Sequence, residues 1–249
     1  MTKKYPKLKF VISKKKELDA YLAFLEDGKY RDNSREMDWA FYQPHPKLQV
    51  LKDRNLSLNQ RKAIVKKYIY DFYKKYLKGI IRRAGKAKKS WRKVEKNFYK
   101  LTDKIFGEYK WPKGKYIAYP TIWGMYPRFL EDKTFQFPPG HKKQNYIRVI
   151  IAHEMLHFIF YDYVYKKSPK LKSHKYDFDL WNISEAFNAV IQNSPKWVKA
   201  FNQKTMIYPE HRDLIRKLRK IWKETNGDID SFFKESLKYD SNKKIQRTT

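Results

Sequence analysis

The chain of 249 residues is strongly basic, with 57 lysine and arginine residues against 26 aspartate and glutamate residues and a formal net charge of +31. Its hydrophobic content of 41% and aromatic content of 17% are enough to build a core, which excludes a globally disordered chain. Cysteine is absent, so disulfides, thiol catalysis and cysteine-based zinc ribbons are excluded, and histidine and carboxylates are the only strong metal ligands.

Location and partners follow from where the apolar and basic residues lie. Near the N-terminus only residues 10–12 are consecutively apolar, which disfavours a cleavable secretion signal, and the longest apolar stretch, 149–161, is too short to span a bilayer. We therefore expect a cytoplasmic monomer without a membrane span. The charge suits polyanions, anionic membrane surfaces or acidic proteins, but lysine is spread over the whole length, as a general lysine bias would produce. Composition alone predicts only weak, nonspecific nucleic-acid binding.

The first 56 residues are expected to form a short strand within 5–12, a helix over 15–26 and an irregular segment over 27–55. Ser57 and Gln60 form a capping box, S-x-x-Q, that opens a helix expected to end near Arg83.

A basic connector at 85–89 and a cap at Ser90 predict a second helix, so that residues 57–106 would form a helical hairpin packed through apolar stripes. The stripes comprise Val65, Ile69, Phe72, Tyr76 and Ile80 on the first helix, and Trp91, Val94, Phe98, Leu101 and Ile105 on the second. The other faces carry the basic residues predicted to contact polyanions: Lys67, Lys74, Lys78, Arg82, Lys93, Lys96, Lys100 and Lys104.

Residues 107–240 differ in composition from the helical segments before them. The aromatic and β-branched segment 115–138 predicts two or three short antiparallel strands, and a helix follows from Asn145. A polar loop over 166–179 precedes expected helices at 181–192, 210–225 and 231–239, and a frayed tail is expected over 241–249.

The most specific signal is the HExxH motif His153-Glu154-Met155-Leu156-His157 in the predicted helix. Side chains four positions apart project from one face of a helix, so the two imidazoles can ligate one zinc ion. Glu154 is rotated about 100° away and can reach a water molecule without becoming a ligand. Burying three ionisable groups without partners costs several kcal/mol, and a metal ion supplies the partner.

A catalytic zinc site needs a third protein ligand. The metzincin extension fails because Phe160 and Tyr163 occupy its Gly and His positions. Two candidates remain: Glu185, in the predicted helix LWNISEAFNAVI, and His174, in a loop-like segment.

The pair of segments HEMLHFIFY and WNISEAFN resembles the gluzincin metalloproteases, over roughly residues 115–192. The resemblance implies His153, His157 and Glu185 as zinc ligands and Glu154 as general base. It also implies that Asn188 orients a ligating histidine. The implied fold is α+β: a zincin-like domain over 107–240 with a small antiparallel sheet packed on the HExxH helix, preceded by the hairpin and followed by a mostly helical C-terminal part.

A weaker resemblance is to the Spartan-type proteases, which are basic and DNA-associated. It implies that His174, followed by Phe178, completes the site in place of Glu185. This chain departs from that family at Lys175, where the family has Gly, and in lacking cysteine. A third alternative is a non-catalytic, zinc-stabilised nucleic-acid-binding protein whose metal is closed off by four protein ligands.

The implied reaction is hydrolysis of a peptide bond in a peptide or protein substrate by a zinc-bound water that Glu154 activates. The oxyanion needs a further donor, for which His211 or Tyr208 are the candidates, with Tyr161 and Tyr163 as weaker ones. The substrate is expected to pair with an edge strand within 129–137.

Overall fold

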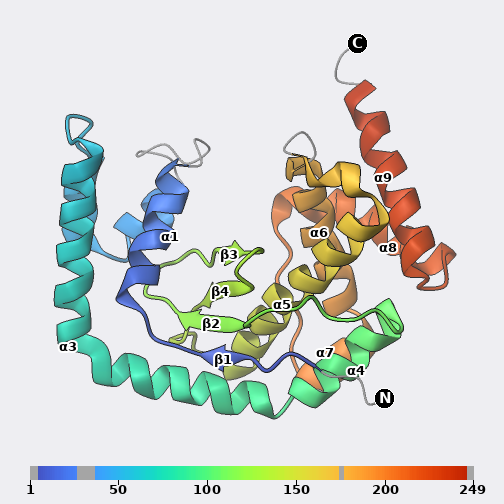
Figure 1. Cartoon of the computed structure of the whole chain (residues 1–249), viewed down its shortest axis with the longest axis horizontal. Helices are drawn as coiled ribbons and strands as arrows, with labels where there is room; N and C mark the ends of the chain where they lie inside the picture. Colours follow the sequence, from blue (N-terminus) through green and yellow to red (C-terminus); the bar gives the residue numbers. More distant parts are fainter. Residues whose placement is uncertain (1–4, 27–36, 174–176, 246–249) are drawn as a thin grey trace. The chain divides into compact units, whose positions relative to one another are not determined.

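The computed structural model describes residues 5–26, 37–173 and 177–245 (Figure 1). The chain divides into two compact units. The sheet unit comprises residues 7–89 and 114–147, and the helical unit comprises residues 1–6, 90–113 and 148–249. The fold class is α+β, as predicted.

The sheet has four strands in the order β1-β2-β4-β3. They are β1 (Lys9–Phe10), β2 (Ile117–Pro120), β3 (Arg128–Phe129) and β4 (Thr134–Phe137). β2 pairs in parallel with both β1 and β4, and only β3 and β4 are antiparallel. The prediction of an antiparallel sheet was therefore wrong, because the sheet is mixed. β4 is also an interior strand, so most of the segment expected to receive a substrate strand is already paired within the sheet.

The connection after β2 explains the parallel pairing. Gly124 donates its N–H to the carbonyl of Ala40 at 2.9 Å, and a Cβ at Gly124 would lie 3.1 Å from the Cα of Ala40. Because this loop is held against another segment, the chain does not turn back beside β2 as a hairpin would. It returns as β3 and pairs with the far edge of β4.

Three helical segments pack with the long helix α3 (Leu58–Arg92) to form the core of the sheet unit. They are α1 (Lys14–Glu26), the π-helical turn η1 (Asp38–Tyr42) and the 3₁₀ segment η2 (Pro46–Lys52). Tyr21, Phe41 and Trp123 meet at its centre, with ring centroids 5.0 to 5.3 Å from Phe41.

The long helix α3 (Leu58–Arg92) begins at the predicted capping box. The N–H of Gln60 donates to Ser57 Oγ at 3.3 Å, and the N–H of Ser57 donates to Gln60 Oε1 at 2.8 Å. The predicted connector at 85–89 was wrong, because the helix continues to Arg92.

The helix α3 continues past Gly85 because one of its faces is buried on both sides of this residue. Ile80, Ala84, Ala87 and Trp91 follow one another at helical spacing and are all buried. Ser90 lies inside the helix and is not a cap; its hydroxyl accepts a hydrogen bond from Arg148 Nε at 2.6 Å. The next helix, α4 (Glu95–Phe106), ends at Gly107, whose φ is +57°. Since α3 and α4 fall mainly in different units, their packing as a hairpin stays a prediction.

The helical unit contains most of α5 (Gln144–Lys167), and α6 (Asp177–Gln192), α7 (Pro195–Phe201), α8 (Arg212–Glu224) and α9 (Ile229–Ile245), with short 3₁₀ turns at Pro169–Lys172 and Pro209–His211. The predicted helices at 181–192, 210–225 and 231–239 are thus present, and the last extends to Ile245, inside the segment expected to be frayed. α7 was not anticipated.

Phe187 of α6 lies at the centre of this unit. Its ring packs against Phe160 of α5 at 5.1 Å, Phe232 of α9 at 5.5 Å and Trp222 of α8 at 6.1 Å. Within the described residues, no helix is long and apolar enough to cross a membrane.

Candidate metal centre

The two histidines of the HExxH motif, on α5, lie close to Glu185, on α6. The Nε2 atoms of His153 and His157 are 3.0 Å apart. One carboxylate oxygen of Glu185 lies 2.9 Å from His153 Nε2, and the other lies 3.3 Å from His157 Nε2. The three side chains thus direct one ligand atom each at a common point.

The spacing of these atoms fits a tetrahedral metal site. Nitrogen and oxygen ligands of zinc lie about 2.0–2.2 Å from the ion, so two of them in a tetrahedron are about 3.3–3.6 Å apart. The measured separations of 2.9 to 3.3 Å are slightly shorter, and a small outward movement of the side chains would admit an ion. Two imidazoles and one carboxylate are also the donor set of known catalytic zinc sites. The residues present therefore fit a zinc ion.

The three side chains of the site are largely buried. His157 is fully buried, and the side chain of Glu185 is 7% exposed, whereas the side chain of His153 retains 17% of its exposure. α5 is apolar and buried on almost every face, so the polar side chains of the motif lie in the interior of the helical unit. The remaining exposure at His153 marks the side from which the site communicates with solvent.

Gln192, at the end of α6, holds the ring of His153. Its Nε2 donates to the carbonyl of Val149 at 2.9 Å, which turns its Oε1 towards the Nδ1 of His153, 3.2 Å away. The Nδ1 atom therefore carries the proton, and the lone pair of the neutral ring is left on Nε2, where the ligand atoms converge.

Sequence analysis missed Gln192 and assigned its role to Asn188. The amide of Asn188 instead donates to the backbone carbonyl of His153 at 3.0 Å, so its hydrogen bond ties α6 to the backbone of α5 and not to the ring. The signal for Gln192 was its position seven residues after Glu185, which places both on the same face of α6.

Glu154 is buried, with 6% exposure, and it is not one of the three residues whose ligand atoms converge. It follows His153 directly on α5, so its side chain leaves the helix about 100° away from the ligand face. This is the position expected of a residue beside the ion and not of a ligand.

The two residues expected to stabilise an oxyanion lie next to α6. His211 is buried, its Nε2 lies 3.0 Å from Asn182 Oδ1, and its ring is 5.3 Å from the ring of Trp181. Burial lowers the pKa of His211, while the negative charges of Glu185 and Glu210 raise it. Tyr208 is 46% exposed and its ring contacts His211 edge-on at 5.9 Å.

The weaker oxyanion candidates have other partners. Tyr163 donates its hydroxyl to Asp230, and the hydroxyl of Tyr161 lies 3.2 Å from that of Ser184. Tyr161 is nevertheless close to the ligands, since its ring lies 6.1 Å from that of His157. The alternative third ligand, His174, lies outside the described residues. Phe178, which would accompany it, is 57% exposed at the start of α6 and stacks on Trp181.

Comparison with protein-family models, with curated proteins and with solved structures finds no match to this chain. A function for the site therefore has to be supported by the chemistry and geometry of its residues.

Proposed function

We propose that this protein is a zinc-dependent metallopeptidase that hydrolyses peptide bonds in a peptide or protein substrate. The observation that supports it best is the convergence of His153, His157 and Glu185, with Glu154 beside them on α5. In the described part of the chain the group contains three ligating residues, which leaves room for a water molecule or substrate as fourth ligand.

In the proposed reaction each residue has a defined task. When bound, zinc would lower the pKa of a water molecule to about 7 and polarise the scissile carbonyl. Glu154 accepts the proton of the attacking water and passes it to the nitrogen of the leaving amine. Gln192 keeps the proton of His153 on Nδ1, so that Nε2 stays available as a ligand. His211 and Tyr208 remain the candidates for binding the oxyanion.

The test compares zinc content with proteolysis in one variant. Glu154→Gln should retain zinc and fold but cleave a complex mixture of denatured proteins at least about 10²-fold more slowly than the natural chain. Glu131→Gln, an exposed glutamate of the sheet unit, is the matched control and should change neither property. Loss of zinc in Glu154→Gln would identify this residue as a ligand, and a zinc-loaded natural chain without any cleavage would contradict the proposal.

A further inference from the structure

A groove separate from the candidate metal centre runs between α4, α7 and α8 of the helical unit. It consists of two adjoining cavities, of about 720 and about 880 Å³, that share Leu101, Lys104 and Lys196. We call it the basic groove. Each of the two cavities taken alone falls in the range typical of small-molecule sites, roughly 300–1,000 Å³.

The rim of the basic groove is cationic. Among the described residues that line the larger cavity, five are basic and none is acidic, although at the overall ratio of the chain about two acids would accompany them. The five are Lys104, Lys196, Lys204, Arg219 and Lys223. None of them forms an ion pair with another described residue.

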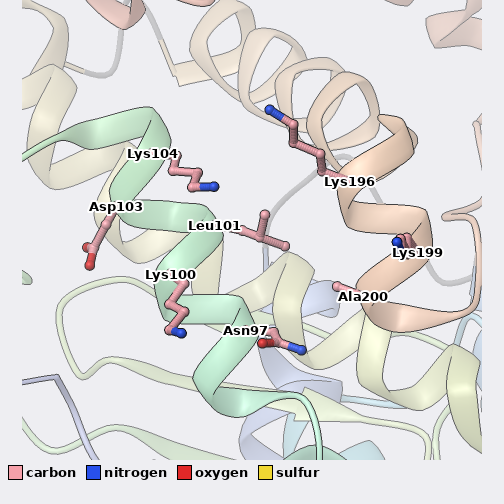
Figure 2. A pocket seen from close by; sticks show the side chains of 8 residues that line it. All are labelled: Asn97, Lys100, Leu101, Asp103, Lys104, Lys196, Lys199 and Ala200. Carbon is pink, nitrogen blue, oxygen red and sulfur yellow. The ribbon is translucent and has the colours of Figure 1, made fainter.

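The smaller cavity has the same character. Lys104 of α4 and Lys196 of α7 extend into the space between the two helices, and Leu101 lies between them (Figure 2). Its one acidic residue, Asp103, points to the other side of α4 in that view and accepts a hydrogen bond from the hydroxyl of Tyr5. The charged side chains that the described residues direct into the groove are thus basic.

The floor of the groove, in contrast, is apolar. Ile105, Val190, Ile191 and Trp197 are buried beneath it, and Trp222 is half-buried. The turn after α8 fixes the Trp222 ring, because Gly227, at φ +75°, brings its backbone so close that a Cβ would lie 3.3 Å from the ring. The floor is therefore a preformed apolar surface.

A cationic rim around an apolar floor is complementary to a molecule with an anionic head and an apolar body. We propose that the basic groove binds a single anionic amphiphile, namely an aliphatic chain that carries a phosphate or carboxylate group. The head contacts the lysines and Arg219 at the rim, and the chain covers the floor.

A nucleic acid and an anionic bilayer surface fit the groove less well than a single amphiphile. A nucleic acid would need flat, exposed aromatic rings for its bases, whereas Trp197 is 3% exposed and most of the floor is aliphatic. A bilayer surface is bound by protruding apolar side chains, whereas this surface is concave. This inference does not depend on the proposed peptidase activity.

Calorimetry on the full chain tests the proposal with dodecyl phosphate, decyl phosphate and inorganic phosphate, below the concentrations at which the alkyl phosphates form micelles. Dodecyl phosphate should saturate one site. Decyl phosphate should bind about fifteen-fold more weakly, because two buried methylene groups contribute about 0.8 kcal/mol each. Inorganic phosphate should show no saturable binding at millimolar concentration. Affinity that does not depend on chain length would overturn the proposal.

A charge-matched pair of variants tests the location. Lys104→Gln/Lys196→Gln/Lys223→Gln should weaken dodecyl phosphate binding at least ten-fold, and Lys62→Gln/Lys66→Gln/Lys74→Gln, on the exposed face of α3, should change it less than two-fold. Equal losses in the two variants would overturn the proposal, since binding would then follow net charge alone. Binding of a single-stranded oligonucleotide, or of anionic phospholipid vesicles, in the absence of any affinity for dodecyl phosphate would also overturn it.

Discussion

The Nε2 atoms of His153 and His157 lie 3.0 Å apart, and the two oxygens of Glu185 lie within 3.3 Å of them. A hydrogen bond between the rings can satisfy this arrangement only if one Nε2 carries a proton. The proton of His153 is held on Nδ1 by Gln192, so His157 would have to be the donor. A divalent cation accepts all of these lone pairs at once and is the simpler partner for the group.

The first prediction concerns metal content. The double variant His153→Ala/His157→Ala should lose the roughly one zinc ion per chain that the natural protein is expected to carry, because a single carboxylate cannot hold zinc tightly. Atomic emission of the purified protein measures this. His141→Ala is the matched control, since His141 lies in the sheet unit and its hydrogen bonds go to Lys143. Full zinc occupancy in the double variant would show that the metal binds elsewhere.

The second prediction decides between the two candidate third ligands. Glu185→Ala should weaken zinc affinity strongly, because the carboxylate is buried beside both imidazoles and its removal leaves two protein ligands. His174→Ala should leave the affinity nearly unchanged. Competition with a chelator of known affinity measures both variants. The reverse order would favour the Spartan-like arrangement, and losses in both would indicate a closed site with four protein ligands.

The third prediction tests whether Gln192 positions His153. Gln192→Leu should lower zinc affinity about 10–100-fold, the range expected for losing the partner of a ligating histidine. Gln192→Glu should restore only part of it, because a carboxylate oxygen can accept the same hydrogen bond but cannot donate to the carbonyl of Val149. The neighbouring Asn193→Ala, whose amide caps a carbonyl of its own helix, serves as control. Unchanged zinc affinity in Gln192→Leu would show that the hydrogen bond between Gln192 and His153 does not position the ring.

Local spacing made the metal centre predictable in part. The four-residue interval between His153 and His157 determines that they share a helix face, whatever the rest of the fold does. Glu185 could be proposed because its segment has the periodicity of a buried helix with one inward carboxylate. Gln192 lies on the same face of that helix, but an amide near a helix end has many other roles, so spacing alone did not single it out.

The error in the strand pairing concerns contacts between distant parts of the chain, whereas the error at Gly85 concerns a pattern within one helix. The strands have only two to four residues, and their pairing depends on how the loop at Gly124 is held by Ala40, which is 84 positions away. The expected helix break at Gly85 did not occur, because Ala84 and Ala87 continue a buried face and offset the cost of one glycine, about 1 kcal/mol. The contact of Gly124 with Ala40 leaves no trace in the local sequence, whereas the buried face of α3 is a local pattern whose small residues, Ala84 and Ala87, were not part of the predicted stripe.

The last prediction concerns stability and pH in the sheet unit, where Glu17 is buried. Its carboxylate accepts hydrogen bonds from the hydroxyls of Tyr73 and Thr121, both at 2.7 Å, and from the N–H of Ile122 at 3.2 Å. Burial raises the pKa of Glu17 from 4.5 to about 7, although these three hydrogen bonds lower it. The folded state therefore binds a proton that the unfolded state has already released between pH 4.5 and about 7.

The stabilisation linked to this proton is fully present below pH 4.5 and is lost as the pH rises to about 7. A pKa difference of this size corresponds to roughly 3 kcal/mol in the free energy of unfolding. Glu17→Gln keeps the size of the side chain and removes the titration, so the variant should gain roughly 3 kcal/mol relative to the natural chain between pH 4.5 and pH 7. Denaturant unfolding followed at several pH values measures the difference, and Glu131→Gln, at an exposed position, should follow the natural chain throughout. Parallel pH profiles for Glu17→Gln and the natural chain would show that the pKa of Glu17 is not raised by folding.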